Sequence, residues 1–234
     1  DSTLLLTSMQ LRDRSAWYHI AVVHDTTQST ATNRLKIYVN GVKVTAYDTN
    51  ILNDTNLPED FDGGVNETGV EHLIGRNQVG NNDLDGYLSD VYLLDGTAVG
   101  DTSGVLNEFI EIKNGICIPK AYSGSYGTHG FHFNFKGTGT STSSGAVSSP
   151  TNIGDDSSGQ NNHWAVNGVG AHDANMPDSP ENNFATMDIL SFPLTTDNIA
   201  EGNLKVGQTD QSVHASAFGI PTSGKWYWEV NTVS

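Results

Sequence analysis

The segment LKIYVNGVKVTAY, residues 35–47, restricts the fold more than any other part of this chain. Leu35, Ile37 and Val39 alternate with residues of different character, which is the two-residue period of a half-buried strand. Asn-Gly follows at 40–41, and this pair readily supplies the two positive φ angles of a tight type I′ turn. The alternation then resumes, so the segment predicts a β-hairpin.

Short apolar or alternating runs recur along the chain, separated by turns rich in Gly, Ser, Thr and Asn. Such spacing predicts many short strands and an all-β chain. A β-sandwich is favoured over a propeller because no four-strand repeat is present. The runs are AWYHIAVVHD (16–25), which is apolar enough for a central strand, HLIG (72–75), DGYLSDVYLLDG (85–96), GFHFNFK (130–136) and GKWYWEV (224–230).

A second Asn-Gly pair lies within IEIKNGICI, residues 110–118, and this region admits two interpretations. One is another hairpin with Asn-Gly in its turn. The other is a short helix over residues 106–113, because Val105, Phe109 and Ile112 also fit helical spacing. The sequence leaves both open.

Composition excludes some classes of partner. Lys and Arg number 11 against 27 Asp and Glu, for a formal net charge of -16, so the chain repels phosphate backbones and nucleic-acid binding is disfavoured. No apolar run approaches the roughly 20 residues that span a bilayer, so no membrane insertion is expected. The single cysteine, Cys117, permits no internal disulfide, which favours folding in a reducing cytoplasm. Cys117 lies within an apolar strand pattern, which predicts that its side chain is buried and serves only in packing.

The order of the runs between residues 16 and 96 carries a family resemblance. A strand with Trp-x-His-Ile, a hairpin of the type Leu-x-Ile-Tyr-Val-Asn-Gly, an Ile-Gly strand and an Asp-Gly-x-Leu-x-Asp-Val strand follow one another. This series resembles LamG-like domains of the concanavalin A-like class. The resemblance implies a jelly-roll β-sandwich.

The larger arrangement resembles tail-fibre and other structural proteins of marine tailed bacteriophages, in which a LamG-like domain leads through a connector into a SPRY-like β-sandwich. The segments that carry this likeness are YSGSYGTHGFHFNF, IGDDSSGQNNHW, DSPENNFATMD, EGNLKV and SGKWYWEV. It implies three regions: the C-terminal part of a LamG-like β-sandwich over 1–136, a Gly/Ser/Asn-rich connector over 137–187, and the beginning of a second, SPRY-like β-sandwich over 188–234. The chain also opens without Met or the features of a signal peptide, so we expect it to be an excerpt of a longer protein.

Enzymatic activity is not expected. Glucanases on the concanavalin-like fold resemble one another in a Glu-x-Asp-x-x-Glu strand motif, which places two glutamates near enough to act as nucleophile and acid. That spacing does not occur in this sequence, and no Gly-x-Ser-x-Gly segment frames a nucleophilic serine.

The polar segment IGDDSSGQNNHW, residues 153–164, is the strongest candidate for a site. Hard oxygen donors, including Asp155, Asp156 and Asn161, suit calcium, and Trp164 with His163 could contact a sugar. The favoured interpretation is nevertheless a turn-forming connector, in which Asx and Ser side chains bond their own backbone and the tryptophan serves as an anchor. No cofactor other than calcium is expected.

Other candidate metal positions are weaker. NNDLDG (81–86) matches the start of an EF-hand-type loop, but position twelve would be Tyr92 instead of glutamate, so a turn is favoured. The acidic loop over 59–62 is expected to be a solvated rim. Zinc is not expected, because His129 and His132 lack partners at ligand spacing, and His132 is predicted on the solvated face of its strand.

The resemblance implies a structural or adhesive virion protein, assembled in the host cytoplasm, trimeric by analogy, and presenting loops to other virion proteins and to host-surface glycans. A secreted lectin module or degraded glycanase is the alternative, and a purely structural spacer is a third. The sequence does not separate these, because all three need the same framework.

Overall fold

The computed structural model describes residues 4–13, 16–63, 65–67, 69–77, 83–100, 105–140, 152–169, 178–182, 184–187, 199–200, 203–206, 222–227 and 229. The chain divides into two compact units, Asp1–Asn182 and Asn183–Ser234. The boundaries expected at 136 and 187 stay predictions. Within the described residues, no helix is long and apolar enough to cross a membrane.

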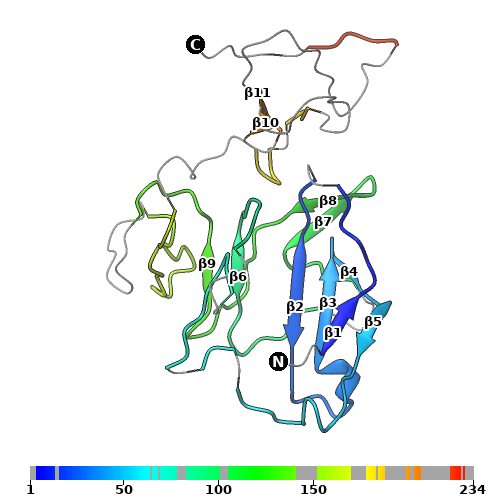
Figure 1. Cartoon of the computed structure of the whole chain (residues 1–234), viewed down its shortest axis with the longest axis vertical. Coiled ribbons are helices and arrows are strands. Elements are labelled where there is room, and N and C mark those ends of the chain that lie inside the picture. Colours follow the sequence, from blue (N-terminus) through cyan, green and yellow to red (C-terminus); the bar gives the residue numbers. More distant parts are fainter. Residues whose placement is uncertain are drawn as a thin grey trace. The chain divides into compact units, whose positions relative to one another are not determined.

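The predicted hairpin forms β3 and β4 of a three-stranded antiparallel sheet in the order β2-β3-β4 (Figure 1). Asn40 and Gly41 have φ values of 48° and 78°, as the type I′ turn requires. In this sheet the strand from the 16–25 run is an outer strand and not a central one, because its one described partner is β3. The strands are β2 (Ile20–His24), β3 (Leu35–Val39) and β4 (Val42–Lys43).

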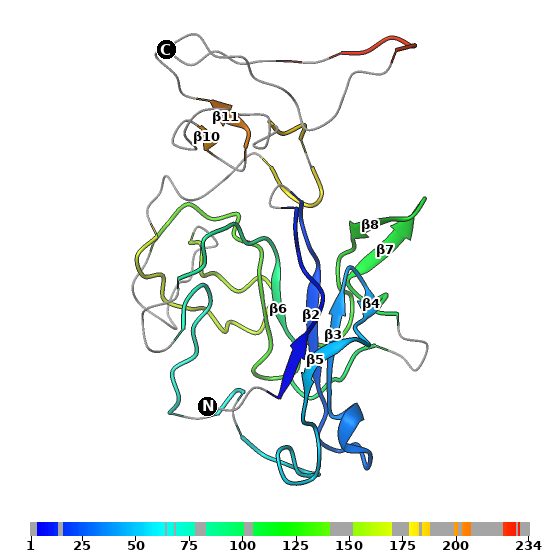
Figure 2. The same cartoon turned by 45° about the vertical axis from the view of Figure 1, so that its right-hand side comes forward.

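Four further antiparallel pairs complete the described strands, so the all-β fold is confirmed. In the first unit the pairs are β1 (Leu5–Thr7) with β5 (Tyr47–Asn50), β6 (Val91–Leu93) with β9 (Phe131–Phe133), and β7 (Ile110–Lys113) with β8 (Ile116–Pro119). Of these pairs, the β7-β8 hairpin is the one seen most plainly in Figure 2. In the second unit β10 (Ile199–Ala200) pairs with β11 (Lys205–Val206). The described helical structure is one short 3-10 turn, η1 (Ala31–Asn33).

The second Asn-Gly pair also forms a hairpin, and the helical alternative for this region is wrong. Asn114 and Gly115 take φ values of 53° and 80°, and Ile110 pairs with Pro119 across β7 and β8. Cys117 lies in β8 and is half-buried against the core.

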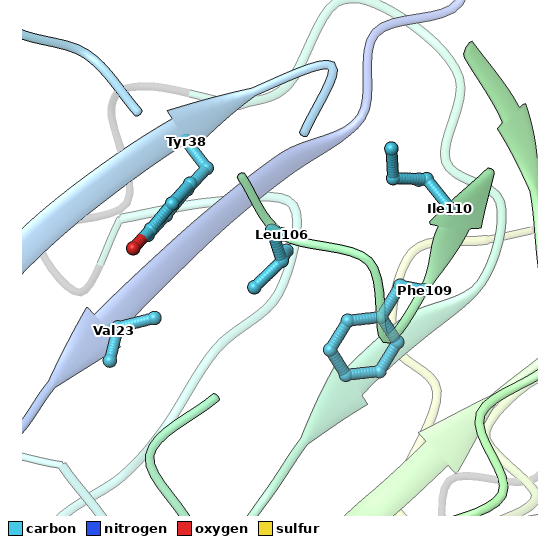
Figure 3. Packing of buried hydrophobic residues seen from close by; sticks show 5 residues of the cluster. All are labelled: Val23, Tyr38, Leu106, Phe109 and Ile110. Atoms are coloured by element: carbon cyan, nitrogen blue, oxygen red, sulfur yellow. The ribbon is translucent and has the colours of Figure 1, made fainter. Parts of the chain in front are cut away.

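The core of the first unit forms where the β2-β3 face meets the start of β7. It comprises Val23, Tyr38, Leu106, Phe109 and Ile110 (Figure 3). Tyr38 is fully buried, although the opposite face of β3 carries the aliphatic residues that defined the sequence pattern.

A side chain on Gly41 would collide with Ile110, so glycine serves both the turn and the packing at this position.

Buried Arg34 organises the acidic loop that follows β5. Its side chain is fully buried; Nη1 donates to Asp54 at 2.6 Å and to the carbonyl of Leu57 at 2.8 Å, and Nη2 lies 3.5 Å from Glu59. Residues 59–62 are exposed, as expected of a solvated rim, and within this rim the Glu59 carboxylate also lies next to the buried Arg34 guanidinium.

Several predicted strands are shorter than expected or absent. HLIG at 72–75 forms no strand, and its neighbour Arg76 makes one isolated bridge to Asp83. The 85–96 run contracts to β6. The described part of GKWYWEV is not a strand and exposes Trp226 and Tyr227 by 60% and 83%. Residues 81–82 of the calcium-like loop, the Ser/Thr-rich stretch 141–150 and residues 188–198 lie outside the described residues.

Candidate functional site on the connector

The connector segment 153–164 lies against β9, whose alternating side chains prepare two different surfaces. Phe131 and Phe133 are buried, while His132 points to the opposite face and is only partly covered. The backbone of the connector pairs with this strand, because Phe133 and Asp156 form an antiparallel bridge and Ser157 N–H donates to the His132 carbonyl at 2.8 Å.

The Asp156 carboxylate is the main fastening of the connector. Oδ1 accepts the backbone N–H groups of His132 at 2.9 Å and Ser158 at 2.8 Å. Oδ2 accepts the Ser158 hydroxyl at 2.8 Å and the Asn162 N–H at 2.9 Å. Burial by itself raises the pKa of this carboxyl, but the hydrogen bonds outweigh it and hold the pKa below its usual value. One ionised side chain therefore ties the strand and the connector together.

Local turn chemistry explains why the sequence folds this way. The N–H of Ser158 bonds the side chain two residues before it, and Gln160 N–H donates to the Ser158 hydroxyl at 3.2 Å in the same pattern. Gly159 and Asn161 take φ values of 87° and 63°. The turn-forming interpretation is thus the one that the hydrogen bonds support.

The other predicted calcium ligands are in different environments. Asp155 Oδ2 accepts the Asn152 N–H at 2.9 Å, and Asp155 Oδ1 is buried 3.6 Å from His163 Nδ1. That nitrogen accepts the Asp156 N–H at 3.0 Å, so it carries no proton. Asn161 is exposed, whereas both aspartates are buried.

Across the described part of the chain, no three His, Cys, Asp or Glu side chains are grouped as metal ligands. Calcium binding stays a prediction. The Asp156 carboxylate, one of its predicted ligands, already accepts hydrogen bonds from four protein donors.

Trp164 anchors the far end of the connector. The centroid of its ring lies 5.0 Å from that of Phe131 and 5.4 Å from that of Phe133, both at steep interplanar angles. The backbone N–H of Trp164 donates to the Gly154 carbonyl at 2.9 Å. Position 154 requires glycine, because a Cβ atom there would collide with the Trp164 carbonyl. The half-buried ring is therefore placed as an anchor, and its contact with a sugar stays a prediction, as does that of His163.

The sequence did not indicate a polar row formed by Asp90, His132 and Ser157. The prediction that His132 lies on a solvated face is wrong, because its side chain is largely covered. Nε2 of His132 lies 2.7 Å from Asp90 Oδ1 and Nδ1 lies 2.9 Å from Ser157 Oγ. The ring stacks on Tyr92, the residue opposite it on β6, at 4.1 Å and 9°. The alternation of GFHFNF placed His132 correctly opposite the phenylalanines, but nothing local indicated the covering partners.

The charge state of this row follows from its contacts. Burial favours the neutral form of Asp90, but hydrogen bonds from His132 and Ser89, with the positive charges of His132 and Lys136, lower its pKa overall. Asp90 is therefore an ionised acceptor, and His132 donates to it through Nε2. Burial raises the pKa of the Tyr92 hydroxyl, and the Asp90 charge adds to the shift.

Asp90, His132 and Ser157 are connected in the order of an Asp-His-Ser catalytic triad. They lack the free N–H donors that would form an oxyanion hole beside the serine. A reacting carbonyl requires N–H donors beside the nucleophile. The N–H of Ser157 already bonds the His132 carbonyl and that of Ser158 already bonds Asp156. The Ser157 hydroxyl also lies 2.8 Å from the same carbonyl. The row therefore fastens the connector to β9 and β6.

Residues 2–101 match a family model described as the concanavalin A-like lectin/glucanases superfamily. This part of the chain is similar to concanavalin A-like domains. No curated protein and no solved structure matches the chain. The concanavalin A-like match includes Asp90 and Tyr92 of the polar row and ends before β9 and the connector.

We expect Asp156→Ala to destabilise the first unit, Asp1–Asn182, by about 2 kcal/mol at neutral pH, because four donors lose a charged acceptor. Since its folded pKa is lowered, the Asp156 contribution is full above the ordinary carboxyl pKa of about 4 and is lost as the pH falls further, through the lowered folded pKa. Urea unfolding at several pH values measures this, with exposed Asp62→Ala as control. The loss should be equal in calcium and in EDTA; a loss seen only with calcium would show a metal site.

We also expect Ser157 to be unreactive toward a fluorophosphonate ester, because its neighbouring N–H groups are already bonded. Mass spectrometry of the intact chain after incubation measures the added phosphonate, with Ser157→Ala and Ser158→Ala as paired variants. Stoichiometric labelling that disappears in Ser157→Ala alone would overturn the structural assignment of the polar row.

Proposed function

We propose that this chain is a non-enzymatic adhesion component of a bacteriophage virion, a tail fibre or related appendage, that contacts glycans on the host surface. The observation that carries the proposal is the concanavalin A-like match over residues 2–101, in a sequence without the paired-glutamate motif of the glucanases. A domain that resembles lectins and glucanases but lacks the glutamate pair for cleavage is suited to bind glycans without hydrolysing them.

The candidate site supports a structural use of the connector. Asp156, Ser157 and Trp164 hold the chain against β9, so the segment that was the strongest candidate for a calcium or sugar site acts as a fastener. A protein that must hold its loops in fixed positions for recognition needs such fastenings more than it needs a mobile reactive loop.

Composition and the single thiol support assembly in a bacterial cytoplasm before incorporation into the particle. Burial raises the pKa of Cys117, which favours the unreactive thiol form. A formal charge of -16 favours solubility during assembly. By analogy with fibres we propose a homotrimer that joins other virion proteins and has no nucleic-acid partner.

The location of the chain on a particle tests the proposal. We expect an antibody raised against this chain to label the tail appendages of purified virions in electron micrographs, with pre-immune serum as control. We also expect the isolated chain to bind host cells and to lose that binding after periodate oxidation of their glycans. Absence from virions together with glycan binding would favour a secreted lectin, and presence in virions without any glycan binding would favour a spacer; either result would overturn the proposal as stated.

A further inference from the structure

A pocket of about 580 Å³ lies away from the connector, between the residues that follow β6 and the ends of the β7-β8 hairpin. Its volume is within the range of small-molecule sites, and its walls mix apolar and polar groups. The lining residues are Thr97, Ala98, Val99, Gly100, Asn107, Glu108, Lys120, Tyr122, Ser123 and Gly124.

Tyr122 supplies an aromatic wall that is held in place from behind. Its ring is stacked on Phe109 at 4.9 Å and 21°, and Tyr126 meets it edge-on at 5.2 Å. Phe109 belongs to the core cluster of Figure 3 and contacts Tyr92 in turn. The Tyr122 hydroxyl donates to the Ser125 carbonyl at 3.1 Å, in a space that requires Gly124 to lack a side chain. The ring is thus fixed before any ligand arrives, which lowers the entropy cost of binding.

The side chains of Glu108 and Lys120, an acceptor and a donor, both hydrogen-bond the backbone of Asn107. Glu108 accepts the Asn107 N–H at 3.0 Å and the Gly100 N–H at 3.4 Å, one on each carboxylate oxygen. Lys120 Nζ donates to the Asn107 carbonyl at 3.1 Å. An ammonium has three donors and a carboxylate oxygen has two lone pairs, so both of these pocket-lining groups keep hydrogen-bonding capacity.

These groups match the chemistry of a sugar ring. A hydroxyl both donates and accepts, so it can bridge Lys120 and Glu108, while the apolar C–H face of a pyranose packs on an aromatic ring. The charged lining residues are one anion and one cation, and the chain as a whole is strongly acidic, so an acidic sugar would be repelled. We infer that this pocket binds a neutral pyranose unit of a glycan. The inference rests on the proposed glycan-binding function and places it in a specific site.

Two variants with a matched control test the pocket. Lys120→Ala removes the donor and Glu108→Gln removes the anion. Lys113→Ala is the control, because it removes an exposed ammonium of the same hairpin that lies outside the pocket. Isothermal titration with the neutral trisaccharides maltotriose, cellotriose, mannotriose and chitotriose, each at up to about 10 mM, measures the dissociation constant, and trigalacturonate is the acidic comparison. Thermal unfolding of each variant confirms that it is folded.

We expect at least one neutral trisaccharide to bind, Lys120→Ala and Glu108→Gln each to weaken that binding at least tenfold, and Lys113→Ala to leave it unchanged. Equal binding by all variants would overturn the pocket and leave the proposed function standing, because the sugar would then bind elsewhere. A preference for trigalacturonate, or no binding of any neutral probe, would also overturn it. The proposed function is tested separately, by antibody labelling of virions and by binding of the chain to host cells.

Discussion

One carboxylate organises the part of the molecule where the sequence concentrates its polar residues. Asp156 accepts hydrogen bonds from β9, from its own turn and from Asn162, so strand and connector are joined at a single charged acceptor. Hydrogen bonds to an ionised acceptor are about twice as strong as those between neutral groups. With Asp156 in place, Ser157 reaches His132 and Trp164 reaches the two phenylalanines.

A ladder of aromatic rings connects this fastening with the core and with the proposed sugar pocket. His132 stacks on Tyr92, Tyr92 contacts Phe109, and Phe109 stacks on Tyr122 at centroid distances of 4.1, 4.9 and 4.9 Å. Such contacts add stability beyond the burial of area. The ladder runs from the connector to the wall of the pocket, so the structural and the proposed binding regions depend on the same packing.

The features that sequence predicted are those determined locally. Both Asn-Gly hairpins formed because positive φ angles at adjacent positions are a property of those residues themselves. The turn around Gly159 followed from Asp and Ser side chains bonding two residues along the chain. The resemblance of residues 16–96 to concanavalin A-like domains was confirmed by the match over 2–101.

What the sequence could not show depended on distant partners. His132 is covered by Asp90 from 42 residues earlier, and Arg34 is buried because Asp54 and Leu57 arrive from 20 and 23 residues later. The pocket combines residues 97–100 with residues 107–108 and 120–124, which lie on either side of the β7-β8 hairpin and were not predicted to form a site. HLIG had the composition of a strand, but strand formation also needs a partner edge, and none is described for it.

Amide hydrogen exchange tests the central claim that Asp156 fastens the connector to β9. The N–H groups of His132, Ser158 and Asn162 all donate to this carboxylate, so we predict that they are protected in the native chain. In Asp156→Asn they should exchange at least tenfold faster, while the Leu106 N–H, which bonds the Gly41 carbonyl, keeps its rate. Exchange of the three amides at the rates of an unstructured peptide in the unmodified chain, or rates unaffected by the substitution, would contradict the account.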